Sequence, residues 1–433
     1  MEECSVSKNK LINNMATCSI LLPNTHSVVL SIYVRAGIKY ESGQHIGVSH
    51  LIEHLLFRRL HDIDQKQLYY KMECMGTTLR AITYNEFIRF YIEVLPKYVS
   101  EAFDLIYKVL LDSQWSHEDI RLEKAVVINQ INKRQFTYSD QIKLDLWDET
   151  PFSNLIMGTK SKIKALSSNT IKKYHNKFFQ PQNCCFVVSG NVSEKQIEKM
   201  HSSLSCLNNS SDIVISTQPV FPLRFTNRTE YDDIIYDICD NYISIKLCFE
   251  IDYNVVKPEL AEYLHSILGD GVGSRLSTVL RERLGLVDEI YTTLDKYNGF
   301  SILSINYDVF HENVFVSLDS VFTMLKEMKN DINERDIHTS SPFLTDNWEL
   351  LYDSPETLNF HYGWKYVLNE IFESPDVIVS KFKCISIDML KKAASQLFVS
   401  KNMMSFIYNN GNLQKSAQIE KRLKYYRLEL DDV

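Results

Sequence analysis

Apolar and polar residues alternate along several short stretches of this chain, which is the pattern of a strand with one buried face. The clearest example is HSVVLSIYVRAG at 26–37, and NYISIKLCFEI at 241–251 has the same pattern about 215 residues later. A strand followed by an amphipathic helix is predicted for 86–110, and the same order returns at 299–325. The two halves of the chain therefore repeat these elements.

A third pair of segments supports the repeat. NCCFVVSGNVSEKQIEKM at 183–200 predicts a strand, a turn and the start of a helix, and NMMSFIYNNGNLQKSAQIEK at 402–421 repeats them. The three offsets are nearly equal, at about 215, 213 and 219 residues. Unrelated strands would not be expected to keep so constant a spacing, so we predict a duplicated domain.

The predicted fold class is α+β, with two duplicated domains that each form a mainly antiparallel sheet with helices on one face. The chain has 433 residues, which is too long for one ordinary core and long enough for two. We expect an N-terminal domain at 1–206 and a C-terminal domain at 229–433. The segment at 207–228 is polar and then contains proline, so it is the predicted linker.

The stretch GVSHLIEHLLF at 47–57 predicts a helix that carries candidate chemistry. His50 and His54 stand one turn apart, so both imidazoles can face one point, as a metal ion requires. Glu53 lies beside that point, where a carboxylate can take a proton from a metal-bound water. The H-x-x-E-H pattern is typical of inverzincin peptidases. The alternative is a helix with two ordinary, partly buried histidines. The apolar stripe that would face the core consists of Val48, Leu51, Ile52 and Leu55.

A second helix is predicted within WSHEDIRLEKAVVINQINKR at 115–134. Its start at Ser116 and Asp119 resembles a capping box, with Asp in place of Glu or Gln. Glu123 and Gln130 share one stripe, because seven residues make two helical turns. Polar groups on an otherwise apolar face require a partner inside the protein. The alternative is that this stripe is a solvated face.

Composition narrows the class of protein. The net charge is −8 and no basic run offsets it, which argues against nucleic acid as a partner. Nine cysteines are scattered without a C-x-x-C pair, and the adjacent Cys184 and Cys185 are expected to be buried thiols in a reducing compartment. No signal-like N-terminus is present, and no apolar stretch approaches the ~18 residues that span a membrane. A soluble, cytoplasmic protein without a membrane partner is therefore expected.

These motifs resemble those of the pitrilysin/insulinase-type zinc metallopeptidases, in the mitochondrial-processing-peptidase-like branch with bacterial members. The resemblance extends over nearly the whole chain and includes GVSHLIEHLLF, MGTTLRAITYNEFIRFYIEV, YHNKFFQPQNCCFVVSGNV and GVGSRLSTVLRERLGL. It implies two like domains that close as a clamshell on an unfolded peptide. It also implies zinc as the cofactor, His50 and His54 as metal ligands, and Glu53 as the general base.

The same resemblance implies a glutamate as the third ligand, 76 residues after the second histidine, and a supporting glutamate seven residues earlier. Glu123 occupies the earlier position, but Gln130 stands where the third ligand is expected. A glutamine offers an amide oxygen without negative charge, and even the loss of an outer partner weakens a metal site about 10–100-fold. The site is therefore predicted to keep the family's architecture and to bind zinc more weakly.

In the second half, the family has an arginine and a tyrosine seven residues apart that hold the scissile carbonyl and stabilise its oxyanion. Arg281 stands in the first position, but Asp288 stands in the second, where a carboxylate does not help an oxyanion. Tyr291 is an alternative if the loop follows a different path. Arg281 is equally compatible with a surface cation beside Arg283.

The resemblance also implies a substrate-binding edge strand that a peptide joins by β-augmentation. The family usually has asparagine where Arg80 stands. Two interpretations of Arg80 are open, since it would either favour an acidic peptide or simply extend into water. The residues expected to bind substrate are Leu79, Arg80, Ala81 and Thr83.

Two functions fit these observations. The first is a zinc-dependent endopeptidase that cleaves small unfolded peptides, such as the leader peptide of a ribosomally made peptide product. It would act as one subunit of a homo- or heterodimer whose partner supplies the arginine and tyrosine. The second is a catalytically impaired or inactive subunit that binds a peptide or an active partner. Glu53 favours the first function, whereas Gln130 and Asp288 favour the second. A third hypothesis, an organelle presequence peptidase, is disfavoured by the lack of a presequence.

Overall fold

The computed structural model describes residues 4–112, 114–148, 150–209, 215–221, 241–408 and 413–432. Two compact units are present, and each has its own sheet and core. Within the described part of the chain, no helix combines the length and the apolar character that crossing a bilayer requires.

The two units are not continuous segments of sequence. Each half of the chain contributes a short piece to the other unit, which continuous domains at 1–206 and 229–433 do not anticipate. The predicted linker at 207–228 falls partly outside the described residues. The first unit comprises Met1–Gln135, Pro151–Gln218 and Glu349–Ser374, and the second comprises Phe136–Thr150, Pro219–Trp348 and Pro375–Val433.

The first unit is built on a six-stranded sheet in the order β1-β2-β8-β3-β7-β6. Strands β2 and β8 are parallel, and the other neighbours are antiparallel. The central strands β3 and β8 are buried along their whole length, which explains why their apolar runs are nearly continuous. The strands are β1 (Ser5–Lys10), β2 (Ala16–Leu21), β3 (Val28–Val34), β6 (Arg80–Thr83), β7 (Ile88–Val94) and β8 (Cys184–Gly190).

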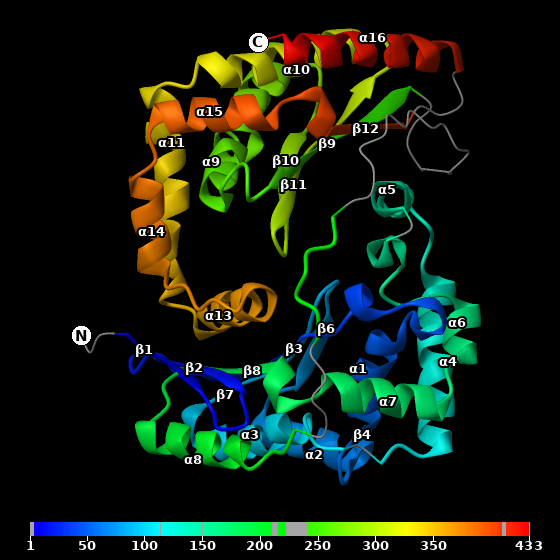
Figure 1. Ribbon diagram of the computed structural model, residues 1–433, viewed down its shortest axis with the longest axis vertical. Helices are drawn as coiled ribbons and strands as arrows, with labels where there is room; N and C mark the ends of the chain where they lie inside the picture. Colours follow the sequence, from blue (N-terminus) through cyan, green and yellow to red (C-terminus); the bar gives the residue numbers. More distant parts are fainter. Residues whose placement is uncertain are drawn as a thin grey trace. The chain divides into compact units, whose positions relative to one another are not determined.

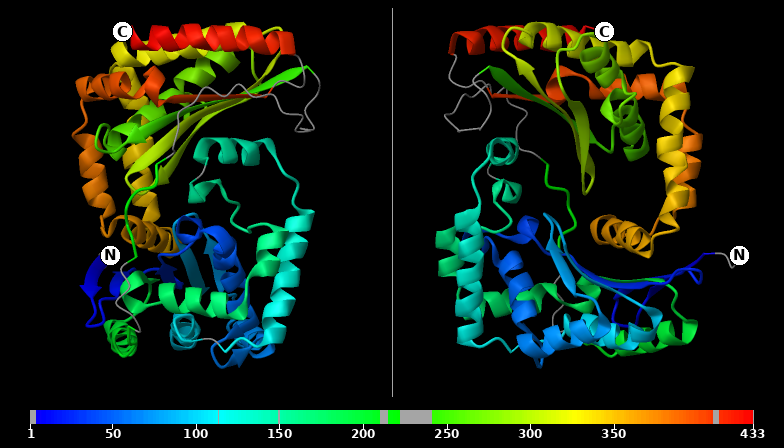
Figure 2. Two further views of the ribbon diagram at one scale, coloured as in Figure 1. Left: turned by 45° about the vertical axis from the view of Figure 1, so that its right-hand side comes forward. Right: turned by 180° about the vertical axis from the view of Figure 1, so that it is seen from behind.

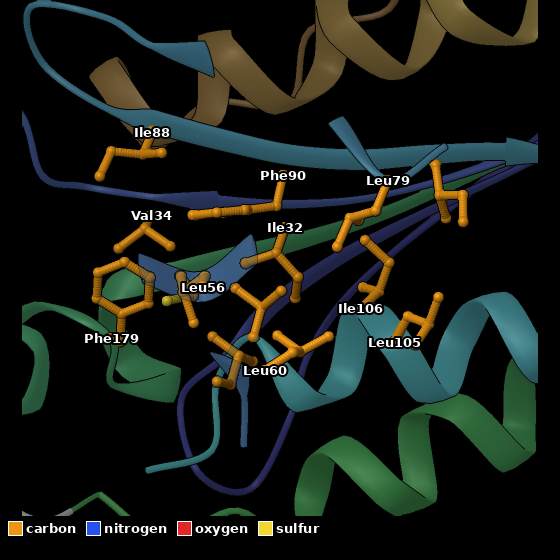
Figure 3. Packing of buried hydrophobic residues seen from close by; sticks show 14 of the residues in the cluster. Ile32, Val34, Leu56, Leu60, Leu79, Ile88, Phe90, Leu105, Ile106 and Phe179 are labelled. Carbon is orange, nitrogen blue, oxygen red and sulfur yellow. The ribbon is translucent and has the colours of Figure 1, made fainter. Parts of the chain in front are cut away.

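Helices cover one face of this sheet with their apolar stripes. Ile32 and Phe90 from the strands meet Leu56 of α1 and Ile106 of α3 in the core (Figure 3). A short β4-β5 hairpin (Arg59–Leu60 and Ile63–Asp64) follows α1. The helices of this unit are α1 (Val48–Arg58), α2 (Gln65–Met75), α3 (Val99–Lys108), α4 (His117–Lys133), α6 (Lys160–Ala165), α7 (Ser168–Phe178) and α8 (Glu194–Ser205).

The other face of the first sheet carries α13 (Pro355–Asn369), which comes from the C-terminal half of the sequence. Figure 1 shows α13 on the side of the sheet opposite to α3 and α8. The hydroxyl of Tyr33 donates a hydrogen bond of 3.0 Å to Oδ1 of Asn359. Gly363 is required in this contact, because a Cβ there would lie 2.1 Å from Cε2 of Tyr33. The sheet is therefore enclosed on both faces, with the second layer supplied from a distant part of the chain.

The second unit has a four-stranded antiparallel sheet in the order β10-β11-β9-β12. Helices α9, α10 and α15 pack on one face, and α16 lies alongside α10 (Figure 2). The strands are β9 (Tyr242–Asp252), β10 (Ile290–Tyr297), β11 (Phe300–Phe310) and β12 (Met403–Tyr408). The helices are α9 (Pro258–Gly269), α10 (Val314–Asn330), α11 (Glu334–Thr345), α14 (Pro375–Lys383), α15 (Ile387–Leu397) and α16 (Leu413–Asp431), while α12 (Asn347–Leu351) precedes α13.

The second unit also receives a helix from the other half of the sequence, α5 (Tyr138–Trp147). The ring of Trp147 lies edge-on to Tyr297 and Phe300, with centroid distances of 5.1 and 5.9 Å. The ring of Tyr138 lies 5.3 Å from that of Tyr408 on β12. Both units thus use one exchanged helix to cover part of the sheet face that their own helices leave open.

The two sheets share one topology, which confirms the predicted duplicated α+β fold. The order β7-β3-β8 in the first sheet corresponds to β11-β9-β12 in the second. Strand β7 leads into α3, and its counterpart β11 leads into α10. Strand β8 leads toward α8, and its counterpart β12 leads toward α16. The three strand pairs matched by sequence periodicity therefore occupy equivalent places in the two sheets.

Candidate active site

Helix α1 starts at a defined point because its first backbone N–H groups are satisfied. The carboxylate of Glu41 accepts hydrogen bonds from the backbone N–H of Gly47 at 2.6 Å and of Ser49 at 2.9 Å. Gly47 has φ of 86°, a conformation that L side chains rarely adopt. Glu41 is buried, and burial raises the pKa of its carboxyl group against the opposing effect of these bonds. This cap fixes where the helix that carries the histidines begins.

His50 and His54 lie side by side on α1. Their ring centroids are 4.8 Å apart, and the ring planes are inclined by 75°. The two side chains are 14% and 19% exposed, so solvent and small ions can reach them. The helical spacing therefore places the two imidazoles together, as the sequence predicts.

Helix α4 places Glu123 and Gln130 against these histidines. It begins with a complete capping box between Ser116 and Asp119, so Asp fills the role usually taken by Glu or Gln. Oε2 of Glu123 lies 3.4 Å from Nδ1 of His54, and Oε1 of Gln130 lies 3.1 Å from Nε2 of His50. The Glu123 side chain is only 7% exposed, so its part of the stripe is not a solvated face.

Glu123 is held from two sides. Besides His54, it lies beside Arg58, whose Nη1 is 3.8 Å from Oε1 of Glu123. Arg58 also approaches Asp119 of α4, with 3.7 Å between Nε and Oδ1. A carboxylate on Nδ1 of a histidine fixes the ring and leaves Nε2 for a metal ion. Glu123 is therefore placed to orient His54.

Glu53 connects the histidine turn to the sheet. Its Oε2 accepts a hydrogen bond from the hydroxyl of Thr83 on β6 and lies 3.6 Å from Nδ1 of His50. Burial by itself would raise the pKa of Glu53. The hydrogen bond and positive charge of His50, together with the hydrogen bond from Thr83, outweigh burial and lower the pKa of Glu53. Burial likewise opposes protonation of His50, but Glu53 outweighs it and raises the pKa of His50. Glu53 is therefore held as a carboxylate.

Strand β6 forms the edge of the first sheet, in the place expected for β-augmentation. Arg80 is exposed and Ala81 is half-buried. Leu79 precedes the strand, its side chain is buried in the core, and its backbone N–H donates a hydrogen bond of 3.0 Å to Sδ of Met72. Thr83 is the residue of this strand that contacts Glu53.

Arg281 belongs to the second unit and lies in a π-helical turn, Ser277–Arg283. Its Nε donates a hydrogen bond of 2.8 Å to the backbone oxygen of Asp288, and its Nη1 lies 3.0 Å from Oε1 of Glu282. Asp288 and Tyr291 line a cleft of about 810 Å³ within this unit. The cooperation of Arg281 with the histidine turn of the first unit stays a prediction.

Among the described residues, no three His, Cys, Asp or Glu side chains gather in a group that could hold a metal ion. The side chain beside His50 on α4 is Gln130, whose amide oxygen carries no negative charge to stabilise a divalent cation. The ligand set of His50, His54 and Gln130 stays a prediction.

Two residues of the site were absent from the sequence-based prediction. Arg58 lies four residues after His54, so its position on the same helical stripe was a usable signal. Glu41 lies in the loop before α1, and no local pattern relates it to the helix it caps. Its role depends on the path of that loop.

Two protein-family models match consecutive segments of this chain. The family model described as Insulinase (Peptidase family M16) matches residues 17–160, and the model described as Peptidase M16 inactive domain matches 165–340. The uncharacterized zinc protease YmxG of Bacillus subtilis is 21% identical over 400 residues, which cover 90% of this chain and 95% of that protein. Mitochondrial-processing peptidase subunit beta of Saccharomyces cerevisiae is 25% identical over 194 residues, which cover 44% of this chain and 42% of that protein.

Solved structures share the fold. A protease from Helicobacter pylori superimposes with a TM-score of 0.81 at 15% identity and covers 94% of this chain and 100% of its own. The peptidase M16 inactive domain from Pseudomonas fluorescens has a TM-score of 0.80 at 16% identity, and the match covers 93% of this chain and 98% of that chain. Together the two family models match well over half of the sequence. This chain therefore belongs to peptidase family M16, the pitrilysin/insulinase-type family that its motifs resemble.

Proposed function

We propose that this protein is a zinc-dependent endopeptidase that cleaves small unfolded peptides. The observation that carries the proposal is the position of Glu53, whose Oε2 accepts a hydrogen bond from Thr83 of the edge strand and lies 3.6 Å from Nδ1 of His50. A general base must lie within hydrogen-bond reach of both the activated water and the bound peptide. Its contacts with His50 and with the edge strand support this role for Glu53.

The side chains that would hold zinc are His50, His54 and Gln130. The two imidazoles are a donor type that zinc prefers, their ring centroids are 4.8 Å apart, and the Glu123 carboxylate lies 3.4 Å from Nδ1 of His54. When bound, zinc supplies a Lewis acid for the peptide carbonyl and for water. Glu53 accepts a proton from the attacking water and returns it to the leaving amine, while Thr83 keeps the carboxylate in place.

The proposed substrate is an extended, unfolded peptide because β6 offers a sheet edge. Such an edge binds a chain through its main-chain groups, which a folded protein has already used. A leader peptide of a ribosomally made peptide product meets this requirement. We further infer a dimer with a related subunit, because Arg281 is bound to the backbone of its own loop and Asp288 replaces the expected tyrosine. We place the protein in the cytoplasm, where thiols such as the buried Cys184 and Cys185 remain reduced.

A second candidate is a subunit that binds a peptide or an active partner without cutting. The neutral Gln130 at the third ligand position favours it, since weak zinc binding would leave the chain without metal. Arg281 favours it too, because its guanidinium is occupied by Asp288 and Glu282. Glu53 and its bond to Thr83 favour the peptidase, since a binding subunit has no use for a positioned base.

Zinc content separates the two candidates. We would measure zinc per chain by elemental mass spectrometry in the unaltered protein, in His50→Ala and in Gln130→Glu, and then assay cleavage of a peptide library. Near one zinc per unaltered chain, lost in His50→Ala, together with cleavage that requires Glu53, supports the peptidase. Zinc in Gln130→Glu but none in the unaltered chain would instead assign the protein to the binding subunits.

A further inference from the structure

Arg80 is the first residue of the edge strand β6, and its side chain is exposed. Among the residues that the structure describes, no carboxylate forms an ion pair with Arg80. Other arginines of the same unit differ, since Arg58, Arg59 and Arg89 each contact a carboxylate. The charge of Arg80 is therefore available to a ligand.

The guanidinium of Arg80 is held near the strand by an aromatic ring. Its central carbon lies 5.9 Å from the centroid of Tyr91, the residue opposite Arg80 on β7. Arg89 approaches the same ring at 4.0 Å, and its own charge is balanced by Glu356 of α13 at 2.6 Å. Contact with an aromatic face limits the freedom of a guanidinium. The guanidinium of Arg80 therefore lies near a ring of the neighbouring strand β7, while the residue stays exposed on the edge strand.

Arg80 and Tyr91 also line a cavity of about 630 Å³ within the first unit. Its other charged residues are Glu73, Glu93 and Lys97. Glu93 lies two residues beyond Tyr91 on β7, past the part of that strand that pairs with β6. A peptide that pairs with β6 would therefore lie opposite Arg80, while Glu93 lies beside the chain that precedes the strand.

We propose that Arg80 forms a subsite for an acidic side chain of the substrate, about three residues from the bond that is cut. This rests on the proposed function, in which a peptide adds to β6. Thr83, which binds Glu53, lies three residues from Arg80, or about 10 Å along the strand at ~3.3 Å per residue. Side chains directly opposite on neighbouring strands have Cβ atoms about 5 Å apart, within reach of an arginine. A guanidinium binds a carboxylate through paired, charge-assisted hydrogen bonds.

The test measures binding of peptides that cannot be cut. Short fluorescently labelled peptides are prepared with Glu, Gln or Lys at one position, and that position is varied from one end of the peptide to the other. Glu53→Gln protein is titrated into each peptide, and binding is followed by fluorescence anisotropy. We expect Glu to bind about two- to fivefold more tightly than Gln at one position, as for an exposed ion pair. The ratio of Glu to Gln affinity should fall to about one when Arg80→Gln is added. When Arg80→Glu is added instead, the peptide with Lys at that position should bind most tightly. Arg121→Gln, an equal charge change on α4, should leave the ratio unaltered.

The outcomes separate this subsite from the peptidase itself. Loss of the Glu preference in Arg80→Gln supports the subsite even if the unaltered protein cuts no peptide, in which case the proposed catalysis fails alone. Cleavage of peptides without any Glu preference keeps the peptidase and overturns the subsite. A Glu preference that survives Arg80→Gln, or the absence of peptide binding, also overturns it.

Discussion

Nε2 of His50 lies 3.1 Å from Oε1 of Gln130, so two helices already bring an imidazole and a neutral amide to the same point. Gln130 brings an oxygen to the position where the family has a glutamate, but this oxygen carries no negative charge. Because a carboxylate stabilises a divalent cation better than a neutral amide oxygen does, we expect charge rather than position to limit the affinity of this site for a metal ion.

Gln130→Glu should therefore increase the affinity for zinc by about tenfold or more. The measurement is competition with a chromophoric zinc chelator. Gln135→Glu makes the same charge change on an exposed side chain five residues along the chain, and it should have little effect. Equal gains in both variants would show that general charge, not ligation, controls zinc binding.

Glu53→Gln should reduce peptide cleavage by about 10²–10⁴-fold, the usual contribution of a general base. The amide keeps the size of the side chain and can still bond to Thr83, so the fold and the zinc content should be retained. Circular dichroism and elemental analysis check those two properties. Full cleavage by this variant would remove Glu53 from the mechanism.

Glu123→Gln should weaken zinc retention about 10–100-fold, because the carboxylate that orients His54 is lost. The rate of zinc release to a chelator reports this change. Glu118→Gln is the matched control, since Glu118 lies in the first turn of the same helix and is exposed. If the two variants release zinc equally fast, Glu123 does not act through His54.

His175 should make the first unit sensitive to acid. It is buried edge-on to Trp115 at 5.2 Å and stacked on Phe179 at 4.4 Å, and burial lowers its pKa from 6.5 to about 4. A histidine with a lowered pKa contributes its full stability above pH 6.5, and that contribution is lost as the pH falls toward 4. The loss in the free energy of unfolding should reach about 3 kcal/mol.

Denaturant unfolding at several pH values checks this dependence. His175→Gln should flatten the fall in stability between pH 6.5 and about 4, because the side chain no longer titrates. His338→Gln, at an exposed histidine, should leave the dependence as it is. A parallel fall in the unaltered protein and in His175→Gln would assign the acid sensitivity to other groups.

Gly363→Ala should destabilise the first unit by about 1–3 kcal/mol, because the new Cβ overlaps the buried Tyr33 ring. The higher helix propensity of alanine, about 1 kcal/mol, offsets only part of this. Thermal unfolding measures the change. Gly273→Ala is the control, since a Cβ at Gly273 meets no atom within 4 Å. A neutral Gly363→Ala would mean that α13 packs on the sheet less closely than described.

The sequence by itself determined the local elements and much of the site. Apolar residues at strand spacing located β3, β7 and β8 and their counterparts in the second half, although β3 and β8 are buried on both faces and not on one as predicted. The capping box at Ser116 set the start of α4. Helical spacing brought His50, Glu53 and His54 to one turn.

Only the tertiary structure decided the partners of these elements. An amphipathic helix shows that one face is buried and not what covers it, so the exchange of α13 and α5 between the units could not be read from periodicity. The contacts of Glu53 with Thr83 and of Glu41 with Gly47 join segments whose proximity depends on the path of the chain. Local patterns fix conformation over a few residues, whereas these contacts arise only when the cores of the two units form.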